Sequence, residues 1–248
     1  MKKKIIGEKI YIFDELSSTM DTSKEMIQRG VEEGTVIMSR YQSMGRGSNN
    51  REWFSNGNDA LFSIILDANA SKVNLLPIIT AYSILITLES QTKRKINIKW
   101  PNDVLIEGKK ISGVLIENFI KGKLSKTIVG VGININSSHK DSKKFIYPAT
   151  SLKEIVNKET NVLEIVKKFL KNFNILYEKL LLEDIDLEKI SKKLYGLGEE
   201  MKFRTNYTRC KNSTNIYKLI SLNGDGTLKV YNSDGEKLNL SYSEITTN

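Results

Sequence analysis

The segment GRGSNNREW at residues 45–53 combines residue types that bind anions. Gly45 and Gly47 can adopt positive φ angles without steric cost, which lets successive backbone N–H groups converge on a negatively charged group. Arg46 and Arg51 add permanent positive charge, and their forked donors suit phosphate or carboxylate. This loop could therefore hold an anionic ligand.

Taken alone, this glycine-arginine loop is weak evidence for a site. Many such loops are solvated turns, and its spacing matches neither a P-loop nor a dinucleotide-binding fingerprint. Trp53 at its end offers a flat face on which a purine ring could stack, but it could equally be a core residue.

Three further segments carry residues that could do chemistry. KWPND (99–103) ends a strand with a lysine, an amide and a carboxylate, which can bind hydroxyls, an amine or a hydrated Mg²⁺. GKKISG (108–113) places two lysines before a strand, and one of them could face a cleft. GVGIN (130–134) places two glycines inside a strand, where glycine weakens pairing, which indicates that another group approaches this backbone closely.

The hydrophobic pattern that positions these segments alternates between strand and helix periods. Strands are predicted at residues 9–15, 35–40 and 60–66 and in the β-rich pieces INIKWPND, VLIEGKKISGVLIEN and KTIVGVGININ. Helices are predicted at residues 17–30, 75–91 and 161–180, the last with a capping-box pattern at Asn161 and Glu164. A turn at Glu107 and Gly108 predicts that the β-rich pieces form a meander.

Beyond residue 196 the pattern changes to short alternating strands separated by NGDG and SDG turns. We therefore expect an α+β fold, with a mixed sheet flanked by helices, over residues 1–195. A small β-barrel domain is expected over residues 196–248.

Composition limits the class of protein. The chain has 248 residues, of which 40% are hydrophobic, and a formal net charge of +9. The single cysteine, Cys210, excludes an internal disulfide, and the single histidine, His139, cannot supply a histidine-rich zinc cluster. The N-terminus lacks the apolar stretch of a signal peptide, and no apolar run is long enough to span a membrane. We expect a cytoplasmic protein.

Six segments in order along the chain resemble those of the biotin protein ligases. They are SST (17–19), YQSMGRGSNNREWFS (41–55), KWPNDV (99–104), GKKISGVLIE (108–117), GVGININ (130–136) and ATSL (149–152). The resemblance implies a class II synthetase/biotin-lipoate ligase-like fold with a C-terminal SH3-like barrel, in the short form without an N-terminal DNA-binding domain. It also implies a two-step reaction: biotin and ATP give biotinyl-5′-AMP and pyrophosphate, and an acceptor lysine then takes the biotinyl group.

The same resemblance implies roles for individual residues. The expected biotin contacts are Ser18, Thr19, Met20, Gln42, Gly45, Arg46, Gly47, Ser48, Lys110, Gly113, Gly130 and Gly132. The expected ATP and adenylate contacts are Arg46, Arg51, Trp53, Asn102, Lys110 and Asn134. The expected catalytic residues are Arg46, Lys110, Lys99 and Asp103, with Asp103 placed to receive the acceptor lysine. Mg²⁺ is expected on the nucleotide phosphates rather than on a cluster of side chains.

Two positions depart from the family pattern. Many relatives read GRGRxGR, and this chain has Ser48 and Asn50 instead, so one cation and one glycine are missing. This predicts weaker retention of the adenylate. Met20 stands where some relatives have asparagine, which leaves the third biotin-side contact open.

The implied acceptor is a biotin carboxyl carrier protein, or such a domain, of a biotin-dependent carboxylase or decarboxylase. A homodimer formed by side-by-side sheets is common in the family. No DNA or membrane partner is expected.

Three alternatives remain open. A lipoate or octanoate ligase shares the fold class but is not expected to combine KWPND with GRG. A nucleic-acid-binding protein would explain the net charge, but the basic residues are scattered and no RNP, zinc or helix-turn-helix pattern accompanies them; a solvated lysine-rich surface explains the charge as well. The presence of both Arg46 and Lys110 argues against a catalytically inactive biotin sensor.

Overall fold

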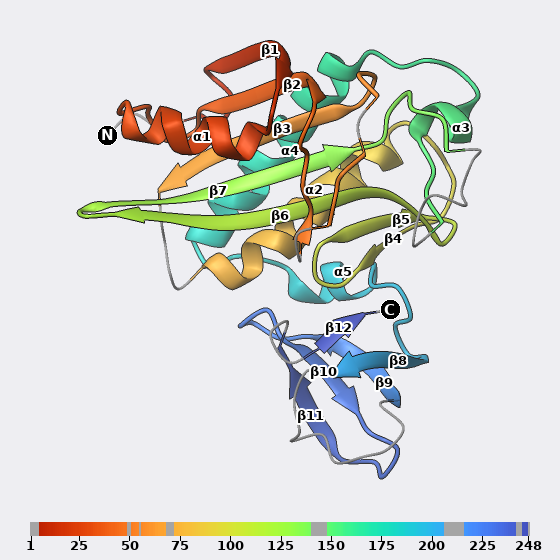
Figure 1. Ribbon diagram of the computed structural model, residues 1–248. Coiled ribbons are helices and arrows are strands. Elements are labelled where there is room, and N and C mark those ends of the chain that lie inside the picture. Colours follow the sequence, from red (N-terminus) through yellow and green to blue (C-terminus); the bar gives the residue numbers. More distant parts are fainter. Residues whose placement is uncertain are drawn as a thin grey trace.

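The computed structural model describes residues 5–48, 51–54, 56–67, 72–139, 148–205, 216–241 and 245–247. Cys210 and Asn50 lie outside this set. Figure 1 shows one wide sheet with helices on its faces and a smaller sheet, below it in this view, formed by the C-terminal strands. The expected α+β fold with a mixed sheet is confirmed.

The wide sheet has seven strands in the order β1-β2-β3-β7-β6-β5-β4. Their bounds are β1 Ile10–Leu16, β2 Val36–Gln42, β3 Ala60–Asp67, β4 Ile96–Lys99, β5 Asp103–Ile106, β6 Lys109–Lys121 and β7 Leu124–Ile133. The first pair, β1 and β2, is parallel, and the other neighbouring pairs are antiparallel. The predicted meander is confirmed, because β4 to β7 are consecutive in both sequence and sheet.

Helices cover both faces of this sheet (Figure 1). Their bounds are α1 Thr19–Gln28, a 3₁₀ turn η2 Val73–Leu75, α2 Leu76–Glu89, α3 Leu152–Val156, α4 Val162–Leu181 and α5 Leu187–Ser191. Ile37 and Ile65 face α1 and pack with its Ile27, whereas the neighbours Val36 and Ile64 belong to the core on the other face. This division follows from the two-residue repeat of a strand.

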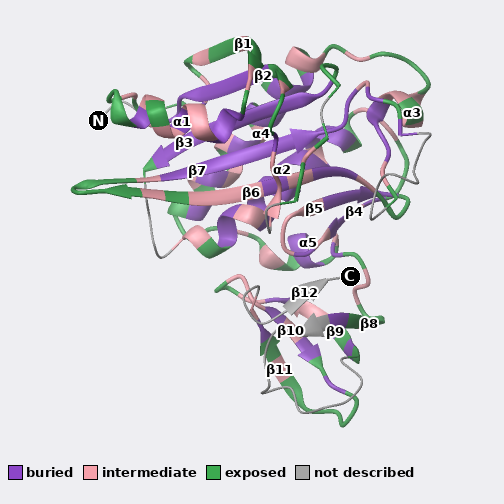
Figure 2. Cartoon of the chain, viewed as in Figure 1, coloured by how far each residue is buried: buried purple, intermediate pink, exposed green. Residues whose placement is uncertain are grey.

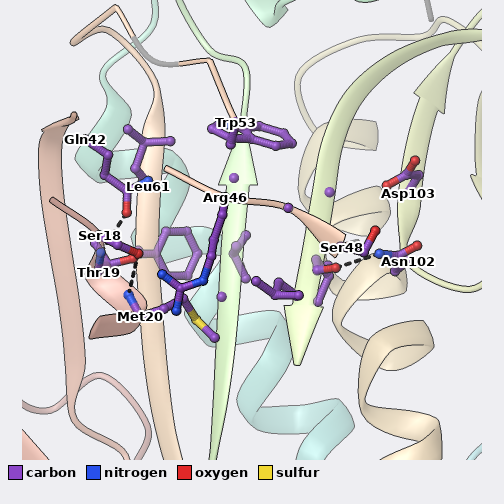
Figure 3. A pocket seen from close by; sticks show the side chains of 18 of the residues that line it. Ser18, Thr19, Met20, Gln42, Arg46, Ser48, Trp53, Leu61, Asn102 and Asp103 are labelled. Carbon is purple, nitrogen blue, oxygen red and sulfur yellow. Dashed lines mark hydrogen bonds between the residues drawn. The ribbon is translucent and has the colours of Figure 1, made fainter. Parts of the chain in front are cut away.

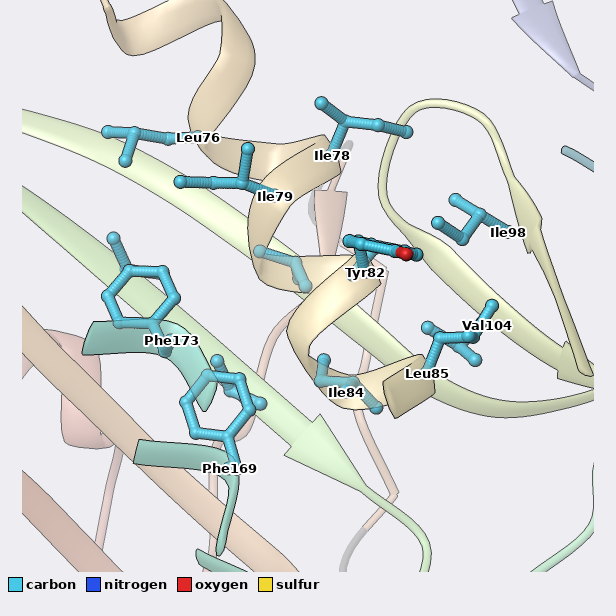
Figure 4. Close-up of a cluster of buried hydrophobic side chains, with 14 of the residues drawn as sticks. Leu76, Ile78, Ile79, Tyr82, Ile84, Leu85, Ile98, Val104, Phe169 and Phe173 are labelled. Atoms are coloured by element: carbon cyan, nitrogen blue, oxygen red, sulfur yellow. The ribbon is translucent and has the colours of Figure 1, made fainter. Parts of the chain in front are cut away.

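The main core lies between the sheet, α2 and α4 (Figures 2 and 4). Because α2 is apolar on nearly all sides, it is buried on nearly all sides. On α4, Phe169, Phe173 and Tyr177 recur every four residues and stack with centroid distances of 5.5 and 5.8 Å. The ring of Phe62 on β3 meets Phe169 edge-on at 5.2 Å, which joins this helix to the centre of the sheet.

Local signals in the sequence set several boundaries. Ser18 caps α1 by accepting a hydrogen bond from the backbone N–H of Met20, and Asn161 caps α4. At the predicted turn, Glu107 and Gly108 have φ angles of 50° and 78°, as a tight hairpin between twisted strands requires. Ser18 thus begins a helix at the segment expected to contact a ligand.

The C-terminal sheet has five strands in the order β11-β10-β9-β8-β12. Their bounds are β8 Glu200–Thr205, β9 Ile216–Leu222, β10 Leu228–Tyr231, β11 Lys237–Leu240 and β12 Ile245–Thr247. The indole Nε1–H of Trp100 donates to the carbonyl of Gly226 over 3.1 Å. The small sheet therefore contacts the wide one beside KWPND, the segment that joins β4 to β5.

Some elements were not predicted. The short helices α3 and α5 and the strand β12 lie in segments without a clear period. The tip of the hairpin formed by β6 and β7 projects past the ends of the neighbouring strands (Figure 1). Among the described residues, none of the helices has the length and apolar character needed to cross a bilayer.

Candidate active site

A cavity lies where the loop after β2 crosses the central strands of the wide sheet (Figure 3). It is lined by Ser18, Thr19, Met20, Gln42, Arg46, Gly47, Ser48, Trp53, Leu61, Phe62, Asn102, Asp103, Lys110, Gly113, Val114, Leu115, Gly130, Val131 and Gly132. Its free space is about 50 Å³, room for a few water molecules only. The structure thus brings most of the predicted ligand contacts to one place.

One end of the cavity is formed by the start of α1 and the end of β2. The backbone N–H of Thr19 donates to Gln42 Oε1 over 2.7 Å, and its hydroxyl lies 2.7 Å from the hydroxyl of Ser63. Figure 3 shows Ser18, Thr19 and Gln42 gathered on this side. Hydroxyl and amide groups held by one another in this way present a fixed set of donors and acceptors to a polar, uncharged ligand group.

The floor of the cavity consists of glycines on β6 and β7. A Cβ atom at Gly132 would lie 2.5 Å from the indole of Trp53, and one at Gly130 would lie 2.6 Å from Met20 Sδ. At Gly113 it would lie 3.0 Å from the same indole. The inference that another group approaches Gly130 and Gly132 closely is correct, and in this structure the approaching groups are side chains of the protein itself.

Trp53 covers part of the cavity floor. Its indole lies over Gly132, and within the described residues its buried Nε1–H has no hydrogen-bond partner. Burying an unpaired donor costs about 1–3 kcal/mol. The indole can therefore leave this position at a reduced cost.

We expect Gly132→Ala to displace Trp53. The ring is rigid and the new methyl group would overlap it, so the emission of Trp53 should change and the free energy of unfolding should fall by about 1–3 kcal/mol. Tryptophan fluorescence and thermal unfolding measure both effects. The matched control is Gly224→Ala, whose methyl group would meet its nearest neighbour, Leu187, at 3.9 Å. Equal behaviour of the two variants would contradict this account of the floor.

The opposite end of the cavity is positively charged. Lys110 Nζ lies 2.7 Å from Asp103 Oδ1 and 5.6 Å from the ring centroid of Trp53. Burial lowers the pKa of the nearby Lys99, and the positive charges of Lys110 and Arg51 lower it further, while Asp103 opposes them. Three cations thus lie near one carboxylate, an arrangement suited to phosphate oxygens.

Arg46 lines the same cavity as Lys110, but its guanidinium is directed elsewhere. It forms ion pairs with Asp21 on α1 and Glu117 on β6, and Figure 3 shows it turned toward Met20. Sequence reasoning missed both carboxylates. The available signals were weak: an acidic residue in the first turn of a capped helix and a glutamate in a strand.

Four predicted contacts lie outside the cavity lining, namely Gly45, Arg51, Lys99 and Asn134. Gly45 packs against the backbone of Trp53, and Arg51 donates to the carbonyl and hydroxyl of Ser48. Asn134 is buried and donates its amide to the carbonyl of Thr150 over 3.0 Å. In this structure Asn134 holds two chain segments together rather than facing the cavity.

Known proteins resemble this chain in both sequence and structure. A family model described as the biotin/lipoate A/B protein ligase family matches residues 12–134, about half of the chain. The bifunctional ligase/repressor BirA of Bacillus subtilis is 29% identical over 244 residues, which cover 96% of this chain and 74% of that protein. The biotin–[acetyl-CoA-carboxylase] ligase of Paracoccus denitrificans is 28% identical over 128 residues, which cover 48% of this chain and 53% of that protein.

Among solved structures, the biotin protein ligase of Aquifex aeolicus in complex with biotin and ATP superimposes with a TM-score of 0.82. The two chains are 28% identical, and the match covers 97% of this chain and 99% of that one. The similarity therefore includes the C-terminal sheet as well as the wide sheet.

Proposed function

Because the chain belongs to the biotin/lipoate A/B protein ligase family, we propose that it is a biotin protein ligase that activates biotin as biotinyl-5′-AMP and transfers it to a lysine of a carrier protein. The observation that carries this proposal is the cavity itself. A polar end at Ser18, a glycine floor and a cationic end at Lys110 follow one another within it. Biotin has matching parts in the same order: a polar ureido ring, an apolar chain and a carboxylate.

In the first step the carboxylate of biotin attacks the α-phosphorus of ATP, so two anionic groups must approach. Lys110, at the cationic end, offsets their repulsion and stabilises the added charge of the transition state. Holding the reactants in line supplies up to about 7–11 kcal/mol in favourable cases. The guanidinium of Arg46 is already engaged by two carboxylates, so we assign the compensation of charge to Lys110.

In the second step an acceptor lysine attacks the mixed anhydride, and it must first lose a proton. Deprotonating an ordinary lysine at neutral pH costs about 4.6 kcal/mol. Asp103 lies in the cavity wall and pairs with Lys110, so it can orient the incoming amine or accept its proton once AMP oxygens engage Lys110. We assign Arg51, Trp53 and Asn102 to the adenylate side.

Mg²⁺ would accompany ATP as part of the substrate. Within the described part of the chain, no three His, Cys, Asp or Glu side chains come together to hold a metal. We expect Mg²⁺ to be held by the nucleotide phosphates rather than by a cluster of side chains. When bound to the phosphates, Mg²⁺ neutralises part of their charge.

We also propose a division into a ligase domain at residues 1–195 and a small SH3-like domain at residues 196–248, in a cytoplasmic protein. The segment before the division stays with the wide sheet: Ile98 N donates to Lys193 O, and Tyr195 N donates to Ile98 O, each over 2.8 Å. The first strand of the small sheet begins at Glu200.

Incubation with biotin, ATP, Mg²⁺ and a biotin carrier domain tests the transfer step. We expect one biotin on one lysine of the carrier, located by mass spectrometry of its peptides. A carrier with arginine at that lysine is the matched control and should remain unmodified. Modification with lipoate or octanoate but not with biotin would assign the chain to the other branch of the family.

We expect this chain to release biotinyl-5′-AMP readily, because Ser48 stands in the cavity wall where many relatives have arginine. Ser48→Arg adds a cation beside the adenylate phosphate and should slow release roughly tenfold. Ser43→Arg adds the same charge to an exposed residue of the same loop outside the cavity and should change little. A slow release from the wild-type protein would contradict this prediction.

A further inference from the structure

Four charged side chains join the loop after β2 to α1 and β6. We call Asp21, Lys24, Arg46 and Glu117 the charge cluster. Arg46 donates to both oxygens of Asp21, from Nη1 over 2.7 Å and from Nη2 over 2.8 Å. It also donates to Glu117 over 3.3 and 3.4 Å, and Lys24 lies 2.7 Å from the same carboxylate.

The charge cluster is balanced and occupies the donors of Arg46. Two carboxylates face two cations, so their charges cancel. Each of the three guanidinium nitrogens donates to a carboxylate, and those on Asp21 have the bidentate geometry that makes such pairs specific. An anion could take Arg46 only by displacing these partners.

Asp21, Glu117 and Arg46 stay charged at neutral pH. Hydrogen bonds from Arg46 lower the pKa of Asp21. Burial alone would raise the pKa of Glu117, but Lys24 and Arg46 outweigh it and lower the value. The hydrogen bond to Asp21 also raises the pKa of Arg46 above its already high value.

The backbone of the loop shows what the cluster holds in place. The N–H groups of Ser43 and Met44 donate to the carbonyls of Leu16 and Ser17, which ties the entry of the loop to the end of β1. The N–H of Trp53 donates to the carbonyl of Gly45 over 2.9 Å, so the indole moves with the turn around Arg46. From that turn, the Arg46 side chain extends to Asp21 on α1 and Glu117 on β6.

We propose that Asp21 and Glu117 are positioning residues that hold Arg46 as a clamp. The clamp keeps the first part of the loop after β2, residues 43–48, over biotin. Arg46 then acts in the wall of the site rather than as a ligand for the negative charge of the substrate, which is left to Lys110. This inference rests on the proposed function for the identity of the ligand. The clamp itself is a property of the protein without ligand.

Asp21→Asn tests the clamp, because it keeps the shape of the side chain and removes its charge. We expect the KM for biotin to rise about 5- to 20-fold, because the loop that carries Arg46 loses a half-exposed charged hydrogen bond. The kcat and the KM for ATP should stay within about twofold of wild type. If Arg46 is instead a substrate ligand restrained by Asp21, the same substitution frees it and the KM for biotin falls, which would overturn the proposal.

Three further variants sharpen this test. Asp14→Asn removes a carboxylate from a different ion pair, with Arg40, whose side chains are 97% and 68% exposed. It should leave the KM for biotin unchanged. Glu117→Gln should raise the KM for biotin, as Asp21→Asn does. In a protein that already carries Asp21→Asn, Arg46→Met should raise the KM for biotin by less than about twofold, because the clamp is already open. If Arg46→Met raises this KM as much as it does in wild type, the proposal is overturned.

Hydrogen exchange in the protein without ligand separates the clamp from the proposed function. Asp21→Asn should speed exchange of the backbone amides in residues 43–53, and Asp14→Asn should not. Unchanged exchange in that segment would overturn the clamp even if wild type ligates biotin. Faster exchange in a protein that never consumes biotin would leave the clamp in place and remove the proposed function instead.

Discussion

Lys110→Met is expected to slow formation of biotinyl-5′-AMP by about 10²- to 10³-fold, the usual loss when a preorganised group that stabilises transition-state charge is removed. Lys110 is a cation of the cavity wall, and its ammonium lies 2.7 Å from Asp103 at the end where the carboxylate and phosphate would meet. Methionine keeps most of the length of the side chain and removes the charge. Single-turnover measurement of pyrophosphate release gives the rate directly.

The adjacent lysine provides the control for this substitution. Lys109 is exposed and outside the cavity lining, whereas Lys110 is half-buried within it. Lys109→Met changes the net charge by the same amount and should retain the wild-type rate within about twofold. Equal losses in both variants would mean that overall charge, rather than a cation in the cavity, supports the reaction.

Asp103→Ala is expected to slow transfer to the acceptor lysine by about 10²-fold or more, the usual contribution of a positioned proton acceptor. Adenylate formation should suffer less, because Lys110 remains in the cavity wall when the carboxylate is removed. The two half-reactions can be timed separately, first by pyrophosphate release and then by adding carrier protein to preformed adenylate.

Asp67→Ala is the matched control for Asp103. Asp67 also pairs with a lysine, Lys126, but at the far end of β3. Its removal should leave both half-reactions near the wild-type rates. Equal losses in the two half-reactions of Asp103→Ala would refute the role in transfer, since the carboxylate would then serve only to hold Lys110.

Much of the site could be predicted because its residues follow strong local signals. Glycine inside a strand is a clear sign that another group approaches the backbone closely. Gly130 and Gly132 interrupt a β-pattern, and side chains of the protein approach both of them. The helix start at Ser18 and the turn at Glu107 can be predicted from the sequence, because each depends only on a few neighbouring residues.

The partners of Arg46 and Asn134 could not be predicted in the same way. Arg46 meets Glu117, which is 71 residues away, and such a contact depends on how the loop, helix and sheet assemble. Asn134 meets the carbonyl of Thr150 across a connection that carries no strand or helix pattern. A motif identifies residue types, but only the assembled fold decides which ones share a cavity.

The contact between the two sheets was also beyond the sequence patterns. The sequence pattern places Trp100 at the end of a strand. In the structure its indole N–H donates to the carbonyl of Gly226, on a turn of the C-terminal sheet. Gly226 has a φ of 86°, and a Cβ atom there would lie 2.7 Å from the carbonyl of Asn74. This turn therefore tolerates only glycine beside the segment that carries Asn102 and Asp103.

The most direct test of the proposed ligase activity, with Lys110 as its essential cation, is pyrophosphate release from ATP in the presence of biotin, lipoate or octanoate. Wild type and Lys110→Met are measured side by side. We expect release that requires biotin, is not supported by the other two acids, and is lost in the variant. Release that is independent of biotin, or that persists undiminished in Lys110→Met, would contradict it.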